Sequence, residues 1–181
     1  MKQNLLITIA ILSSLILFVV GCEIGTNPLI LDSSVSNKIV INDPAPIIGE
    51  LPFPSMTIDT KTLQGVAGEG IENISFYNLT LMVDSNTTPT NGKISARLMV
   101  NDTLLVKMDS LSLSLFNTER SIFETIPGFH FDNTGLGIVL RAVKNPPQNG
   151  IKLQMFVGPT NTAVHFRLWV KVYGQIQTKV K

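Results

Sequence analysis

Alternation of apolar and polar residues dominates the chain from residue 55 onward. In residues 94–101 the apolar side chains occupy every second position, which places them on one face of a half-buried strand. The runs 71–83 and 164–176 follow the same period of two. Many short strands separated by turn residues are typical of a sandwich or a barrel. The pattern therefore predicts an all-β fold, an antiparallel β-sandwich of immunoglobulin-like or jelly-roll type.

Turn residues and one break in the alternation indicate how these strands connect. Asn101-Asp102 predicts a tight hairpin turn. The apolar face changes near Asp109-Ser110, which predicts a β-bulge or a corner where the strand changes sheets. Residues 136–144 and 151–157 are expected to form a hairpin across an intervening loop. Apart from a helical turn at 119–124, we expect no amphipathic helix after the first 21 residues.

The first residues carry a different pattern. Lys2 precedes an apolar run over residues 5–20, which Gly21 and Cys22 follow directly. A secretory signal peptide has a positively charged N-terminal region, an apolar core and a small residue before the site where a signal peptidase cleaves the chain. The apolar run is shorter than the roughly 20 residues of a membrane-spanning helix. The pattern favours a cleaved signal helix, and an uncleaved transmembrane helix is the alternative.

The motif Val19-Val20-Gly21-Cys22 resembles the lipobox of bacterial lipoproteins. In that family the cysteine thiol receives a diacylglyceryl group, and a dedicated peptidase then cuts before it, here between Gly21 and Cys22. The resemblance implies that Cys22 is the lipidation site and that the membrane is a partner through this anchor. Two or more acyl chains hold a protein on a bilayer stably. Glu23 is not the Asp that retains lipoproteins at the inner membrane, so the resemblance implies the outer membrane if the source is diderm.

Serine and proline are frequent in the next segment, residues 22–54, which has the composition of a tether. It contains a candidate edge strand at 38–42, because Ile39-Val40-Ile41 is β-branched throughout. The prolines that follow exclude a central strand or a helix there. The predicted organisation is a signal peptide at 1–21, a tether at 22–54 and a β-sandwich domain at 55–181.

Charge and cysteine content narrow the function. After the signal, the chain has 13 basic and 13 acidic side chains and no block of like charge. With such a balance, binding of nucleic acid through bulk electrostatics is not predicted. Cys22 is the only cysteine, so its lipidation leaves no thiol for a disulfide or a thiolate metal site. No catalytic signature such as G-x-S-x-G, H-E-x-x-H or a P-loop occurs, so neither an enzyme nor a cofactor is predicted.

The outward face of the 164–176 run offers the best candidates for binding. This face is predicted to hold His165, Arg167, Trp169, Lys171 and Tyr173. Aromatic residues flanked by cations can stack on sugar rings or anchor a protein partner. The alternative is that a neighbouring strand or the tether covers these side chains.

A second constellation would imply catalysis. His130 and Asp132 would share one face of a strand, and with His165 they could form a metal site or an acid–base pair. Zinc sites usually need three or four ligands at recognisable spacings, and none are visible, so no metal site is predicted. The leading hypothesis is a lipid-anchored module of the cell envelope that binds a protein or a glycan in adhesion, assembly or a structural role. A small envelope hydrolase or metal-dependent enzyme is the alternative.

Overall fold

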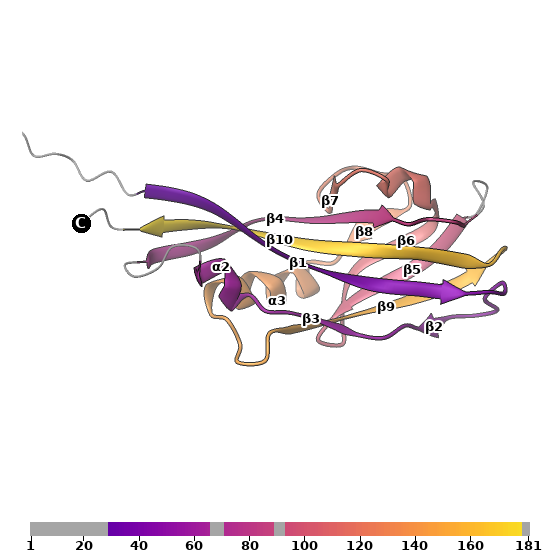
Figure 1. The fold of residues 1–181 in the computed structure, drawn as a ribbon, viewed down its shortest axis with the longest axis horizontal. Coiled ribbons are helices and arrows are strands. Elements are labelled where there is room, and N and C mark those ends of the chain that lie inside the picture. The colour runs from indigo at the N-terminus through magenta and orange to yellow at the C-terminus, as the bar shows by residue number, and fades with distance from the viewer. Residues whose placement is uncertain (1–28, 66–70, 89–92, 179–181) are drawn as a thin grey trace, which may run out of the picture.

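Two antiparallel β-sheets pack against each other in the computed structural model, which describes residues 29–65, 71–88 and 93–178 (Figure 1). The inward side chains of both sheets belong to a single hydrophobic core. The prediction of an all-β antiparallel sandwich is therefore confirmed. The lipobox and its Cys22 lie outside the described residues.

The first sheet contains the longest strands. Its order is β1 (Leu29–Asp43), β10 (Val164–Thr178), β4 (Ile71–Asp84) and the short β7 (Arg120–Ser121). The strand β10 lies between β1 and β4 and pairs with both. Residues far apart in sequence therefore lie side by side around β10.

The second sheet has six strands. Five of them follow the order β2 (Leu51–Pro52), β9 (Ile151–Thr160), β5 (Lys93–Val100), β6 (Thr103–Ser112) and β8 (Phe129–Phe131), and β3 (Met56–Ile58) also pairs with β9. The helices are α2 (Lys61–Gly65), α3 (Asn133–Lys144) and the 3-10 turn η1 (Leu113–Phe116). In Figure 1, α2 and α3 lie beneath the part of the first sheet that extends toward the start of β1.

The inward and outward faces of β10 are those that the alternation predicts. Its inward apolar side chains are at most 1% exposed, and they are Val164, Phe166, Leu168, Val170, Val172 and Ile176. Gly174 shares their register, and an added Cβ there would be in ordinary van der Waals contact with Leu63 of α2, 3.5 Å away. Burial of this face places the alternate residues of β10 on the outer surface of the sandwich.

Both features predicted for the strands β5 and β6 are present. Asn101 and Asp102 connect them with φ of 45° and 62°, the left-handed conformations that a type I′ hairpin turn requires. Ser110 has φ of 54°, and the β5–β6 register shifts between Ile94 and Ala96. This bulge turns the apolar face of β6, as the break in the sequence pattern predicted.

The predicted hairpin over 136–144 is wrong, because these residues belong to the helix α3. Asp132 caps the helix by accepting hydrogen bonds from the backbone N–H groups of Thr134 (2.8 Å) and Gly135 (3.3 Å). Buried Leu136, Val139 and Val143 follow a helical spacing. A Cβ on Gly135 would lie 2.1 Å from the Leu104 carbonyl oxygen, so this glycine is required by packing. The helical turn expected at 119–124 is likewise replaced by the short strand β7 and a turn.

The candidate edge strand 38–42 exists but is much longer than predicted. The strand β1 pairs with β10 from Leu29↔Thr178 to Asp43↔Val164, so most of the proposed tether 22–54 before Pro44 belongs to the sheet. This edge strand carries Ser33 on its buried face and Ser34 and Ser36 on its exposed face, which makes its composition resemble that of a linker. Within the described ranges, the structure contains no helix with the length and apolar character to cross a bilayer.

Candidate functional site

The five side chains predicted as a binding face lie together on the outside of the four-stranded sheet. His165 is exposed, and Arg167, Trp169, Lys171 and Tyr173 are each partly exposed. They are flanked in register by β1 on one side and β4 on the other, with Lys38 and Met82 opposite Trp169. We call this surface, with its flanking residues of β1 and β4, the Trp169 face. The structure brings the predicted residues together and leaves them accessible.

Trp169 is held in place by an ion pair of its neighbours. Arg167 donates two hydrogen bonds to the Asp84 carboxylate, from Nε at 2.7 Å and from the guanidinium Nη2 at 2.9 Å. The indole Nε1 of Trp169 donates to the same carboxylate at 3.0 Å. The Arg167 guanidinium first, and then the Trp169 N–H, hold the pKa of Asp84 below its ordinary value. Asp84 therefore remains ionised at neutral pH and fixes both side chains.

A cation also lies over the indole. The Nζ atom of Lys38 is 5.4 Å from the centroid of the Trp169 ring, within the range of a cation–π contact. Lys38 comes from the edge strand β1 and its side chain is exposed. Such exposed contacts contribute only about 0.5–1 kcal/mol. Lys38 can therefore be displaced from the ring at small cost.

Glu119 joins the loop before β7 to the Trp169 face. Its carboxylate accepts hydrogen bonds from the hydroxyls of Thr80 and Tyr173, and Lys171 Nζ lies 4.0 Å from its second oxygen. The Thr80 and Tyr173 hydroxyls hold the pKa of Glu119 below its ordinary value. The Tyr173 hydroxyl, with Glu119 nearby, raises the pKa of Lys171, whose Nζ lies 4.5 Å from the Tyr173 ring centroid. Both Glu119 and Lys171 are therefore charged at neutral pH.

A cavity of about 240 Å³ lies between these groups. It is lined by Ser36, Met82, Glu119, Trp169 and Lys171. Two of these five residues, Trp169 and Lys171, were predicted from sequence because both lie on β10. The others become neighbours only through strand pairing and the loop before β7, and no local sequence pattern indicates them.

The residues of the alternative catalytic site do not form one site. His130 lies on β8 in the six-stranded sheet, whereas His165 lies on β10 in the other sheet, where its Nδ1 is 3.0 Å from Asn42 Oδ1. Asp132 caps α3, and the backbone N–H groups of the cap lower its pKa. Over the part of the chain that the structure describes, no three His, Cys, Asp or Glu side chains are grouped to hold a metal ion.

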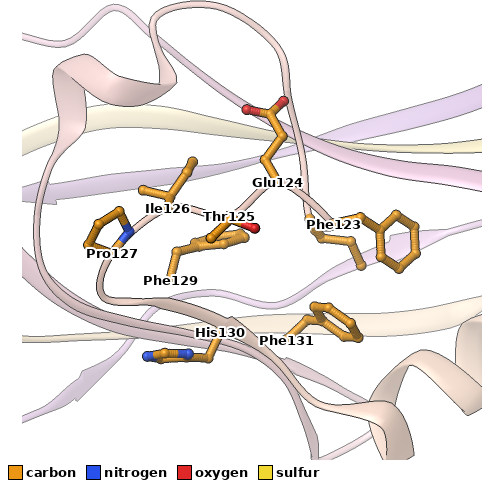
Figure 2. A pocket seen from close by; sticks show the side chains of 9 residues that line it. Phe123, Glu124, Thr125, Ile126, Pro127, Phe129, His130 and Phe131 are labelled. Atoms are coloured by element: carbon orange, nitrogen blue, oxygen red, sulfur yellow. The ribbon is translucent and has the colours of Figure 1, made fainter.

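A second pocket of about 370 Å³ lies between β8 and the loop that leads to it (Figure 2). Figure 2 shows Phe123 and Phe131 facing each other, and their ring centroids are 5.3 Å apart in an edge-to-face arrangement. Phe76 of β4 makes a similar contact with Phe123 at 6.3 Å. Glu124 points away from these rings and pairs with Arg120 at 3.2 Å. We call this the Phe123 pocket; its aromatic lining suits an apolar group.

Comparison with known proteins adds little about function. No family model matches the chain, and no curated protein matches it. Among solved structures, the crystal structure of FLHE is 8% identical, with a TM-score of 0.39 and coverage of 78% of this chain and 96% of that one. A structure from Turnip yellow mosaic virus is 11% identical, with a TM-score of 0.39 and coverage of 84% and 96%. One from Desmodium yellow mottle tymovirus is 11% identical, with a TM-score of 0.37 and coverage of 85% and 90%. Similarities this low carry no argument about what the chain does.

Proposed function

We propose that this chain is a lipid-anchored binding module of the bacterial cell envelope, not a catalyst, and that it contacts its partner through the Trp169 face. The observation that carries the proposal is the row of aromatic and charged side chains on the central strand β10. Arg167, Trp169 and Tyr173 are partly exposed, yet hydrogen bonds to Asp84 of β4 and to Glu119 of the loop before β7 hold them in fixed positions. A preorganised surface loses little side-chain entropy on binding, and Trp, Tyr and Arg are the usual binding hot spots.

The anchor supports a role at the bilayer surface. The lipobox resemblance implies lipid on Cys22, and only residues 23–28 separate it from β1. Fully extended, this segment spans at most roughly 25 Å. The Trp169 face would therefore lie within reach of other components of the envelope.

The placement of the alternative catalytic residues favours binding over catalysis. Asp132 has a structural task at the start of α3, and His165 is oriented by Asn42. The charges of the Trp169 face are paired with one another, as in Arg167 with Asp84. Paired, strongly ionised groups are suited to orienting a ligand rather than to exchanging protons at neutral pH.

The anchor can be tested by the variant Cys22→Ser. The parent should lose residues 1–21 and carry acyl chains at its new amino terminus, which mass spectrometry of the mature protein measures. The variant should remain an uncleaved precursor without lipid, because serine lacks the thiol that accepts the diacylglyceryl group. Processing and membrane retention of Cys22→Ser at the parent's level would refute the anchor.

The surface can be tested by site-specific photo-crosslinking in intact cells. A photoreactive residue at Lys38 places the probe on the Trp169 face, and one at Lys107 places a matched probe on the six-stranded sheet. Lys107 is a suitable control because it is also an exposed lysine on a strand. We expect a discrete adduct from Lys38 and none from Lys107. Equal capture from both positions, or none from Lys38, would contradict the proposal.

A further inference from the structure

The cavity beside Trp169 combines apolar walls with paired charges. Trp169 and Met82 supply the apolar surface, and Ser36, Glu119 and Lys171 supply polar groups. At about 240 Å³ the cavity is smaller than the roughly 300–1,000 Å³ of sites for drug-sized ligands. It therefore has room for one small ring, and a longer molecule would extend across the open sheet.

The charges around the cavity disfavour an ionic ligand. Glu119 and Lys171 are 4.0 Å apart, so an anion that approaches Lys171 also approaches the Glu119 carboxylate. A cation that approaches Glu119 likewise approaches the Lys171 ammonium. Asp84, the other carboxylate beside Trp169, is already paired with Arg167. A ligand without charge is therefore the best match to this arrangement.

A purely apolar ligand is disfavoured as well. Covering Glu119 and Lys171 with an apolar group would remove water from both without supplying hydrogen bonds in return. The ligand must therefore carry both donors and acceptors around its rim. It must also have an apolar face for the indole of Trp169, whose N–H is already engaged by Asp84.

We propose that this cavity binds one neutral sugar ring of a glycan, with the C–H face of the ring against Trp169 and its hydroxyls on Glu119, Lys171 and Ser36. Sugar hydroxyls both donate and accept, so adjacent hydroxyls satisfy a carboxylate and an ammonium together. This inference rests on the proposed function, because it names the partner class for the Trp169 face. A glycan of the envelope would extend from the cavity along the strands.

The chain provides its own reporter for this site. Trp169 is the only tryptophan, so fluorescence of the full lipidated protein in detergent, excited at the red edge where its two tyrosines absorb little, reports on the cavity. The probes are methyl α-D-glucopyranoside and methyl N-acetyl-β-D-glucosaminide as neutral rings, with methyl glucuronide and glucosamine as charged rings of similar size. We expect a saturable change in Trp169 emission with at least one neutral glycoside and a response at least tenfold weaker with both charged sugars.

Two variants and one control locate the response. Ser36→Phe fills the cavity from an exposed position of the edge strand and should abolish the change while leaving the melting temperature unaltered. Glu119→Gln should raise the glycoside concentration at half-saturation about tenfold, because a charge-assisted hydrogen bond becomes a neutral one. Glu124→Gln, which changes a carboxylate on the other side of β7 that is paired with Arg120 outside the cavity, should bind like the parent.

The outcomes separate this inference from the proposed function. No saturable change with either neutral glycoside, an equal response to a charged sugar, or an unaltered response in Ser36→Phe would overturn the sugar site. If capture from Lys38 persists in that case, the Trp169 face remains the binding surface and only the ligand class is wrong. If the glycosides bind but Lys38 captures nothing in cells, the sugar site stands and the envelope function is refuted.

Discussion

The cavity beside Trp169 and the Phe123 pocket are built by different means. The first is formed mainly by side chains of three long, paired strands; a hydrogen bond to Asp84 fixes its Trp169, and its Glu119 accepts a hydrogen bond from the neighbouring Tyr173. The second is formed by one loop and the short edge strand β8, and edge-to-face contacts among phenylalanines fix its shape.

This difference indicates which of the two surfaces is preorganised to bind a ligand selectively. Hydrogen-bonded polar groups at fixed positions discriminate between ligands, because a wrong ligand leaves them unsatisfied. Aromatic contacts stabilise the loop but impose few directional demands on a ligand. The proposed binding therefore belongs to the Trp169 face, with a mainly structural role for the Phe123 pocket, and variants at both surfaces test this proposal.

The largest effect is expected for Trp169→Ala. The variant removes the central apolar wall of the cavity and leaves Asp84 without one of its donors. We expect the free energy of unfolding to fall by about 2 kcal/mol, less than for a fully buried tryptophan. Capture from Lys38 should fall at least tenfold, measured by adduct yield beside urea unfolding. Trp169→Phe keeps most of the apolar wall and should recover stability. Capture from Lys38 in Trp169→Ala at the parent's level would contradict binding through the Trp169 face.

Phe123→Ala tests the structural role of the Phe123 pocket. It removes the contacts with Phe76 and Phe131, which should lower the free energy of unfolding by about 1–2 kcal/mol. The Trp169 face lies on other strands, so adduct yield from Lys38 should not change. A matched fall in stability and capture would show that the Phe123 pocket takes part in binding.

The fold was predictable from sequence where apolar and polar residues alternate along a long strand. The residues of β10 and β5 were assigned to the correct faces because apolar side chains recur at every second position. The same property made the five outward residues of β10 predictable as one surface. Register between strands is a tertiary property, so Lys38, Met82 and Asp84 could not be placed beside Trp169 from local pattern.

Three features that the sequence analysis missed have identifiable physical causes. The helix α3 was missed because Gly135 and Gly137 interrupt its pattern, although the Asp132 cap and the spacing of its apolar residues were visible signals. The full length of β1 was missed because a polar edge strand has the composition of a linker. Glu119 was missed because a loop positions it, and only contacts with Thr80 and Tyr173 show its role.

A smaller effect is expected at Asp132. Asp132→Ala removes the cap of α3 and should lower the free energy of unfolding by about 1 kcal/mol, whereas Asp132→Asn should retain most of it. Neither variant should change capture from Lys38. Chemical denaturation measures the first effect and adduct yield the second. Loss of capture from Lys38 in Asp132→Asn, with the free energy of unfolding preserved, would instead favour a catalytic role for this carboxylate.

The smallest effect concerns pH. The pKa of Asp84 is lowered below its ordinary value of 3.8 by Arg167 and then by Trp169. The unfolded chain therefore binds this proton at a higher pH than the folded chain does. The stabilisation is complete above the ordinary value and is lost as pH falls through the folded pKa. We expect a loss below about 1 kcal/mol, as for exposed ion pairs, and a flatter dependence of unfolding free energy on acid pH in Asp84→Asn.

The most direct test of the central claim uses single cysteines at three positions of similar exposure. Val40 on the Trp169 face is 49% exposed, Phe123 is 45% exposed, and Leu140 on α3 is 42% exposed. Since Cys22 is the only native cysteine and is blocked if lipidated, each introduced thiol can be followed alone with a maleimide. The measurement is the labelling rate in intact envelopes relative to the purified protein. We predict that Val40→Cys is protected several-fold in envelopes while Phe123→Cys and Leu140→Cys are not, and equal rates at all three positions would contradict binding through the Trp169 face.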